Sequence, residues 1–105
     1  MLPILMVFLI QGAAAYTNTL NNFGCKDRVT NYPEAGCAAW TPGSSTVDMM
    51  VAAWNNDLQA YDCSQVDPRF RRGTCCSDPF YLRYQKSVNV WKEHCREIDG
   101  SGIKP

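Results

Sequence analysis

The sequence predicts a small, disulfide-rich and mainly α-helical fold, in which three disulfide bonds staple two amphipathic helices and an irregular N-terminal loop. Three observations favour this fold class. The 105-residue chain contains six cysteines, a density typical of small secreted domains whose hydrophobic core alone is marginal. Two segments repeat apolar residues at spacings of three and four, as one face of an α-helix does. Pro and Gly interrupt the first cysteine-containing segment too often for a long helix.

Residues 1–15 have the pattern of a secretory signal peptide. An unbroken apolar run from Leu2 to Ile10 is followed by a polar break and then by Ala13–Ala15, the small residues that signal peptidase requires. This run is too short for a membrane span, which needs about 20 residues. We therefore expect cleavage after Ala15 and a secreted, extracellular product.

The remaining chain is expected to form one disulfide-stapled domain over residues 25–105, preceded by a flexible polar lead over residues 16–24. The segment from Cys25 to Pro42 contains Pro33 and Gly36, and it is predicted to be an irregular loop tied down by its cysteines. The segment from Asp62 to Ser77, with Pro68 and Gly73, is predicted to be a connection between the helices.

The first helix is predicted over about Thr46 to Tyr61. Ser45 is a suitable N-cap, and Asp48 three residues later forms a capping-box arrangement with Asp in the usual place of Glu. Apolar residues then recur at helical spacing: Val47, Met50, Val51, Trp54, Leu58 and Tyr61.

The second helix is predicted from Asp78–Pro79, an N-cap followed by Pro at the first helical position, to about Asp99, where Gly100 provides a stop signal. Its apolar face contains Tyr81, Tyr84, Val88, Trp91, Cys95 and Ile98. We expect the two apolar faces to bury each other. The aromatic residues would then be core residues rather than the lining of a ligand groove: Trp54, Tyr61, Tyr81, Tyr84 and Trp91.

The even number of cysteines allows all of them to pair within one chain: Cys25, Cys37, Cys63, Cys75, Cys76 and Cys95. Six cysteines allow 15 pairings, and excluding the three that would join the neighbours Cys75 and Cys76 leaves twelve. Each neighbour must therefore bond to a different segment. We expect a buried bridge from Cys95 to the loop or the first helix, and we favour a bond from Cys63 to Cys75 or Cys76. The spacing fits neither an insulin-type precursor nor an ShK-type toxin domain, because no further cysteine lies close to the vicinal pair or to Cys95.

The sequence predicts no catalytic residues, no metal site and no cofactor. His94 is the single histidine, it lies beside Cys95 and is flanked by Glu93 and Arg96, and no CxxC pair, HExxH motif or phosphate-binding loop is present. We therefore predict that the chain is not an enzyme.

The charge pattern has opposite signs in two parts of the chain. The formal net charge is zero, which argues against a polyanion such as nucleic acid as the partner. Residues 27–67 carry about minus five and residues 69–96 about plus five, either because the two parts attract each other or because the second part presents a basic surface. The candidate binding residues on such a surface are Arg69, Arg71, Arg72, Arg83 and Lys86. Residues 69–72 also match the Arg-x-Arg-Arg pattern of secretory processing proteases.

These features predict a secreted cysteine-rich binding protein, a toxin or a virulence effector directed at a host. It would act as a monomer, by protein–protein binding to a receptor, channel or host protein, with a membrane surface as the less favoured partner. Two alternatives remain open. One is a processed, hormone-like ligand of two chains. The other is an inhibitor of a secreted enzyme, with Cys25–Pro42 as its reactive loop.

Overall fold

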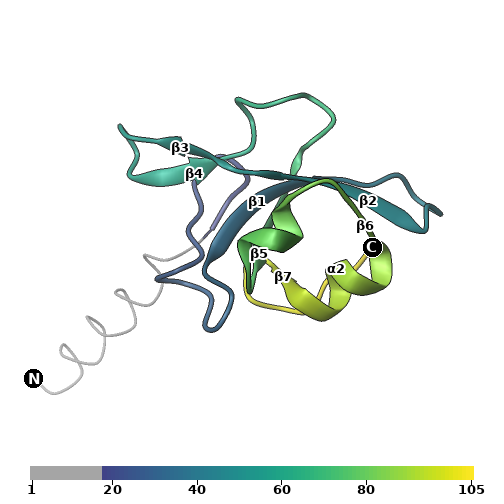
Figure 1. Cartoon of the computed structure of the whole chain (residues 1–105). Coiled ribbons are helices and arrows are strands. Elements are labelled where there is room, and N and C mark those ends of the chain that lie inside the picture. Colours follow the sequence, from purple (N-terminus) through teal and green to yellow (C-terminus); the bar gives the residue numbers. More distant parts are fainter. Residues whose placement is uncertain (1–17) are drawn as a thin grey trace, which may run out of the picture.

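The structure, a computed structural model, describes residues 18–105 and is mainly β, so the prediction of a mainly α fold is wrong. The expected signal peptide over residues 1–15 lies outside the described residues. A five-stranded antiparallel sheet has the order β6-β2-β1-β5-β7 (Figure 1). Its strands are β1 (Glu34–Ala39), β2 (Thr46–Val51), β5 (Arg72–Cys76), β6 (Gln85–Ser87) and β7 (Cys95–Glu97).

The first predicted helix is instead β2 followed by a separate two-stranded hairpin, β3 (Ala53–Asn55) and β4 (Ala60–Asp62). Val47 and Met49, two residues apart, are buried, whereas Thr46, Asp48 and Met50 on either side of them are only partly buried. Burial therefore has the period of a strand rather than that of a helix. The sequence permits both periods, and pairing of β2 with β1 and β6 selects the extended form.

The second predicted helix is divided into three short elements. Asp78 caps η1 (Pro79–Leu82) by accepting a hydrogen bond from the backbone N–H of Phe80, and Pro79 lies in the first turn, so the predicted start is confirmed. The 3₁₀-helix η1 ends after one turn, however, and β6 and then α2 (Val88–His94) follow. Ser87 caps α2, which ends at His94 because Cys95 joins β7 alongside β5. No helix of the described chain is both long and apolar enough to cross a membrane.

The two segments predicted to be loops contain the central strands. Cys25–Pro42 includes β1, and Asp62–Ser77 includes β5, which pairs with β1 on one side and β7 on the other. Four consecutive residues of β1 are buried, 35–38, and all of them are small. Small side chains let other segments pack closely on both faces. At Gly36, an added Cβ would lie 3.0 Å from the backbone oxygen of Met50 and would collide with Leu82.

The three expected disulfide bonds are present, and the vicinal cysteines bond to different segments as predicted. Cys75 bonds to Cys25, and Cys76 bonds to Cys95. The bond favoured from Cys63 to one of the vicinal pair is wrong, because Cys63 bonds to Cys37. Successive side chains of a strand point to opposite faces, so the two bridges from β5 lie on opposite faces of the sheet.

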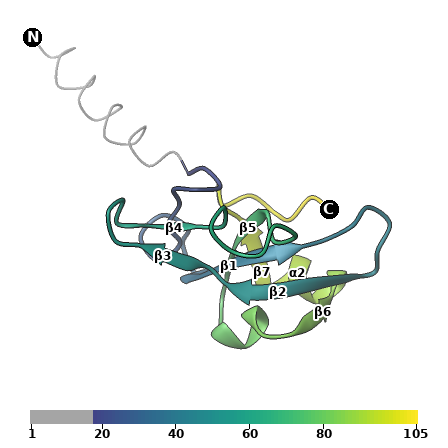
Figure 2. The same ribbon diagram turned by 90° about the horizontal axis from the view of Figure 1, so that it is seen from above.

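Each face of the sheet carries its own buried cluster. The first cluster includes Phe23 and Val29 from the segment before β1. Residues 18–24 are the described part of the lead expected over 16–24, and Phe23 and Gly24 at its end are buried. Asn18 also donates to the backbone oxygen of Ile98 (2.6 Å). The second cluster includes Leu82 of η1 and Trp91 of α2. The β3–β4 hairpin extends from one end of the sheet, and β6 lies at the other (Figure 1 and Figure 2).

We predict that Thr74→Val lowers the free energy of unfolding by about 1–3 kcal/mol, because it leaves buried polar groups without partners. Thr74 is fully buried; its Oγ1 accepts from Trp91 Nε1 (3.2 Å) and donates to the backbone oxygen of Arg96 (2.9 Å). Urea unfolding measures the change, with Thr30→Val on the exposed surface as the control. Equal stability of the two variants would contradict this role.

We also predict that removing the bridge between Cys25 and Cys75 destabilises the fold more than removing the bridge between Cys76 and Cys95. The first closes a separation of 50 residues and the second one of 19. Loop-closure entropy then gives losses of about 4 and about 3 kcal/mol, respectively. Urea unfolding of the two Cys→Ala double variants tests the order, and the reverse order would show that loop closure does not dominate.

Candidate functional site

The five basic residues singled out in the sequence do not form one surface. Arg69 and Arg71 lie in the loop between β4 and β5, and Arg72 begins β5. Arg83 and Lys86 lie with η1 and β6, on the other side of β1 and β2 in the sheet order.

Two of these basic residues, Arg72 and Arg69, form ion pairs within the described chain. The side chain of Arg72 forms an ion pair with Glu97, donates to the backbone oxygen of Lys104 (2.6 Å) and lies over the Trp91 ring (4.8 Å). It therefore joins β5, β7 and the C-terminal segment. Arg69 forms an ion pair with the exposed Asp67, and its backbone N–H and guanidinium lower the pKa of that carboxyl.

The Arg-x-Arg-Arg motif lies at the start of a central strand. The bond after Arg72 is inside β5, whose two neighbours are β1 and β7, and Phe70 within the motif is buried. A protease needs an extended, accessible segment, so the folded chain presents this bond poorly.

Arg83 and Lys86 lie in the segment of residues 80–86, which also carries two exposed aromatic rings. Phe80 is 61% exposed and Tyr84 is 83% exposed, and the Lys86 ammonium lies 4.2 Å from the centre of the Phe80 ring. We call this set of four residues, Phe80, Arg83, Tyr84 and Lys86, the aromatic–basic surface.

Neighbouring residues hold the aromatic–basic surface in place. Leu82 is buried against Gly36, and the ring of Tyr81 stacks on His94 with 4.2 Å between the ring centres. Gln85 donates from its side-chain amide to Asp48 of β2 (3.0 Å). Contacts of Tyr81, Leu82 and Gln85 therefore fix this segment, and the residues of the aromatic–basic surface lie next to them in the chain.

Tyr84 has a φ of 63°, in the left-handed region that non-glycine residues rarely adopt. A bulky residue held in this region while its side chain remains exposed contributes little to packing. Strained and exposed residues of this kind concentrate at functional positions.

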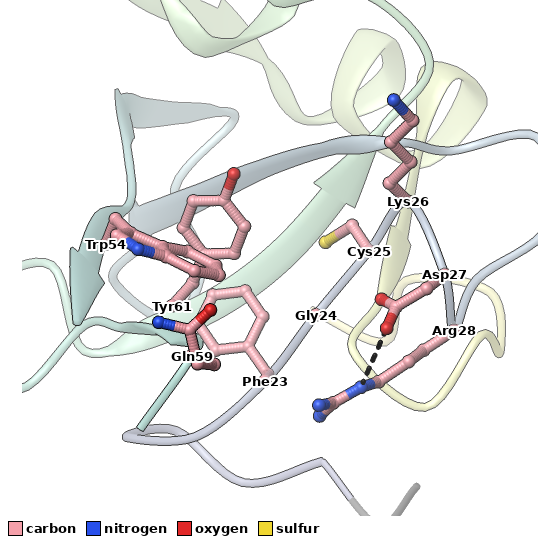
Figure 3. A pocket seen from close by; sticks show the side chains of 9 residues that line it. All are labelled: Phe23, Gly24, Cys25, Lys26, Asp27, Arg28, Trp54, Gln59 and Tyr61. Atoms are coloured by element: carbon pink, nitrogen blue, oxygen red, sulfur yellow. Dashed lines mark ion pairs between the residues drawn. The ribbon is translucent and has the colours of Figure 1, made fainter. Parts of the chain in front are cut away.

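A pocket of about 520 Å³ lies at the other end of the sheet, between the segment before β1 and the β3–β4 hairpin (Figure 3). Figure 3 shows the aromatic rings on one side and the charged side chains on the other. The residues that line it are Phe23, Gly24, Cys25, Lys26, Asp27, Arg28, Trp54, Gln59 and Tyr61.

The aromatic side of the pocket is built on a backbone link between distant segments. The backbone N–H groups of Phe23 and Tyr61 each donate to the other's carbonyl oxygen, at 3.1 and 2.8 Å. The Tyr61 ring contacts Trp54 edge to face, with ring centres 5.0 Å apart, and lies 6.1 Å from Phe23. Trp54 remains 52% exposed.

The charged side of the pocket is a turn that follows Cys25. Arg28 pairs with Asp27 (Nε to Oδ2, 3.7 Å) and donates from Nη1 to Asn18 Oδ1 (2.7 Å). Arg28 is therefore oriented and largely covered, whereas Asp27 and Lys26 are exposed. The bridge from Cys25 to Cys75 fixes this turn to β5.

The pocket is lined by aromatic and charged side chains, and the single histidine lies outside it. In residues 18–105, no three or more His, Cys, Asp or Glu side chains gather as metal ligands would. His94 faces Tyr81 and lies 4.0 Å from Glu93, away from the pocket. Comparisons with protein-family models, curated proteins and solved structures found no match for this chain.

Sequence reasoning missed the pocket because its parts come from separate segments. Trp54 and Tyr61 were expected to be core residues of a helix, and Phe23 was placed in a flexible lead. Trp54 lies in the short strand β3, where side chains alternate between the two faces, and it is the exposed one of the three residues.

We predict that Tyr84→Gly is more stable than Tyr84→Ala by about 1 kcal/mol, because only glycine adopts a φ of 63° without steric cost. Both variants lack the ring, so the comparison isolates the backbone. Urea unfolding measures the difference. The matched control is Arg83, whose φ of −117° suits any residue, so that Arg83→Gly should be less stable than Arg83→Ala. The same order at both positions would contradict strain at Tyr84.

Proposed function

We propose that this chain is a secreted, cysteine-rich binding protein of the toxin or effector class, which binds a protein target through the aromatic–basic surface. The observation that carries this proposal is Tyr84, a bulky side chain that is 83% exposed on left-handed backbone. The three disulfide bonds are compatible with secretion.

The residue types of this surface suit a protein interface. Tyr and Arg are enriched among the residues that contribute most to binding. Tyr buries a large, rigid ring at little conformational cost, and Arg offers several hydrogen-bond donors on a planar cation. Leu82 and Tyr81 already hold the backbone, which reduces the ordering cost of binding.

The charges favour an acidic partner. Arg83 is exposed beside Tyr84, and Lys86 lies over Phe80. The two neighbouring acids already accept hydrogen bonds within the chain, Asp48 from Gln85 and Asp78 from the backbone of Phe80. An acidic protein surface would therefore complement the two cations and increase the rate of association.

A protein partner is favoured over a membrane. Arg69 and Arg71 lie in a different part of the fold, so only Arg83 and Lys86 belong to this surface. Each basic residue near an anionic bilayer contributes about 1 kcal/mol, and two of them give weak attachment. The two alternatives from the sequence also receive less support: the bond after Arg72 lies in β5, and a third of the expected reactive loop is the largely buried strand β1.

The proposal is tested by identifying a partner and then measuring the effect of the surface on affinity. Cross-linked capture from target-cell surface proteins would supply candidates, and the purified candidate would be titrated calorimetrically. We expect Tyr84→Ala to weaken binding about tenfold or more, and Arg83→Glu with Lys86→Glu to weaken it further. Arg71→Glu on the distant loop is the matched control and should bind as the unmodified protein does.

Two results would overturn this proposal. One is a partner whose affinity is unchanged by both surface variants. The other is binding to vesicles containing anionic phospholipid that is as tight as binding to the protein and equally sensitive to Tyr84→Ala.

A further inference from the structure

We propose that the pocket between the segment before β1 and the β3–β4 hairpin is a carbohydrate-binding site that takes a pyranose unit of a glycan. This site is distinct from the aromatic–basic surface, which lies with η1 and β6. The proposal rests on the two different walls of the pocket (Figure 3).

The aromatic wall fits the apolar faces of a sugar ring. A pyranose presents C–H groups on its faces and hydroxyl groups around its rim. Trp54 is 52% exposed and borders the pocket, and Tyr61 supports it edge to face. A large, half-exposed ring of this kind buries the C–H groups of a sugar without having to move.

The opposite wall supplies hydrogen-bonding groups of both kinds. Each sugar hydroxyl both donates and accepts, so its recognition needs acceptors and donors side by side. Asp27 contributes carboxylate oxygens and the exposed Lys26 contributes N–H donors, and the guanidinium of Arg28 lies beside them, held by Asp27 and Asn18. Charged partners form stronger hydrogen bonds than neutral ones do.

The same geometry disfavours three other ligands. An organic cation would meet two cations, Lys26 and Arg28, against the single carboxylate of Asp27. A flat base sandwiched between rings would need parallel planes, whereas the planes of Trp54 and Tyr61 are inclined at 73°. A purely apolar molecule would strip water from the charged wall without replacing its hydrogen bonds.

The pocket is formed before a ligand arrives. The bridge from Cys25 to Cys75 holds the charged turn on the sheet, and the reciprocal bonds between Phe23 and Tyr61 hold the hairpin beside it. Asn18 orients Arg28. Little conformational entropy is therefore lost on binding, which suits the small contact area of a sugar.

The test is a ¹H–¹⁵N NMR titration of the folded protein with defined tetrasaccharides. The panel contains β-1,4-linked N-acetylglucosamine, β-1,3- and β-1,4-linked glucose, α-linked mannose and α-1,4-linked galacturonate. The indole N–H signals of Trp40, Trp54 and Trp91 report on separate places in the fold. We expect at least one sugar to shift the Trp54 signal with a Kd between about 0.1 and 10 mM, and to leave the Trp91 signal unchanged.

Variants of the pocket and of its surroundings separate recognition from folding. Trp54→Ala should weaken binding at least about tenfold, and Asp27→Asn should weaken it several-fold. Leu58→Ala, on the same hairpin but outside the pocket, and Tyr84→Ala should bind sugar normally. Unchanged Trp40 and Trp91 signals in Trp54→Ala establish that the variant is folded.

The proposal is overturned if no sugar of the panel moves the Trp54 signal at about 10 mM. It is also overturned if a sugar binds with the same affinity to Trp54→Ala and Asp27→Asn, since binding would then lie elsewhere. Two variants distinguish this site from the aromatic–basic surface. Tyr84→Ala should lose protein binding and keep sugar binding, and Trp54→Ala should lose sugar binding and keep protein binding.

Discussion

The fold depends on two neighbouring cysteines that point in opposite directions. Because side chains alternate along a strand, Cys75 and Cys76 of β5 bond across opposite faces of the same sheet. One bridge holds the segment before β1 against the first face, and the other joins β5 to the neighbouring strand β7 at Cys95, directly after α2, on the second. A chain of this size buries too little apolar surface to cover both faces of a sheet securely, so covalent links at the centre stabilise both layers at once.

Each layer attached by these bridges carries one of the two candidate binding regions. On the first face, the turn after Cys25 and the hairpin that pairs with Phe23 form the pocket. On the second, Leu82 and Tyr81 anchor η1, so that Phe80 and Tyr84 are displayed. In both regions buried or stacked residues alternate with exposed aromatic ones. Exposing large rings gives up the free energy that their burial in the core would contribute. A rigid scaffold in return loses little conformational entropy when it binds a partner.

Local signals in the sequence predicted local features well. The cap at Asp78 with Pro79 after it is present, and the vicinal cysteines bond to different segments as their spacing required. The helix predicted over Thr46–Tyr61 failed because Val47, Met49 and Val51 in its first part also fit the period of two of a strand. Trp54 was read as a core residue as part of the same helix. The pocket could not be predicted, since it joins Phe23 to Tyr61 across the sequence.

The sequence by itself determined the number of cross-links, the divergence of Cys75 and Cys76, and the start of η1. These features depend on neighbouring residues, whose geometry a few bonds define. Only the tertiary structure decided that the fold is a sheet and that Trp54 borders a pocket. The hydrogen-bonding partners of β1 lie in β2 and β5, and β5 lies more than thirty residues away in the chain. Short apolar segments adopt the form that such distant partners stabilise.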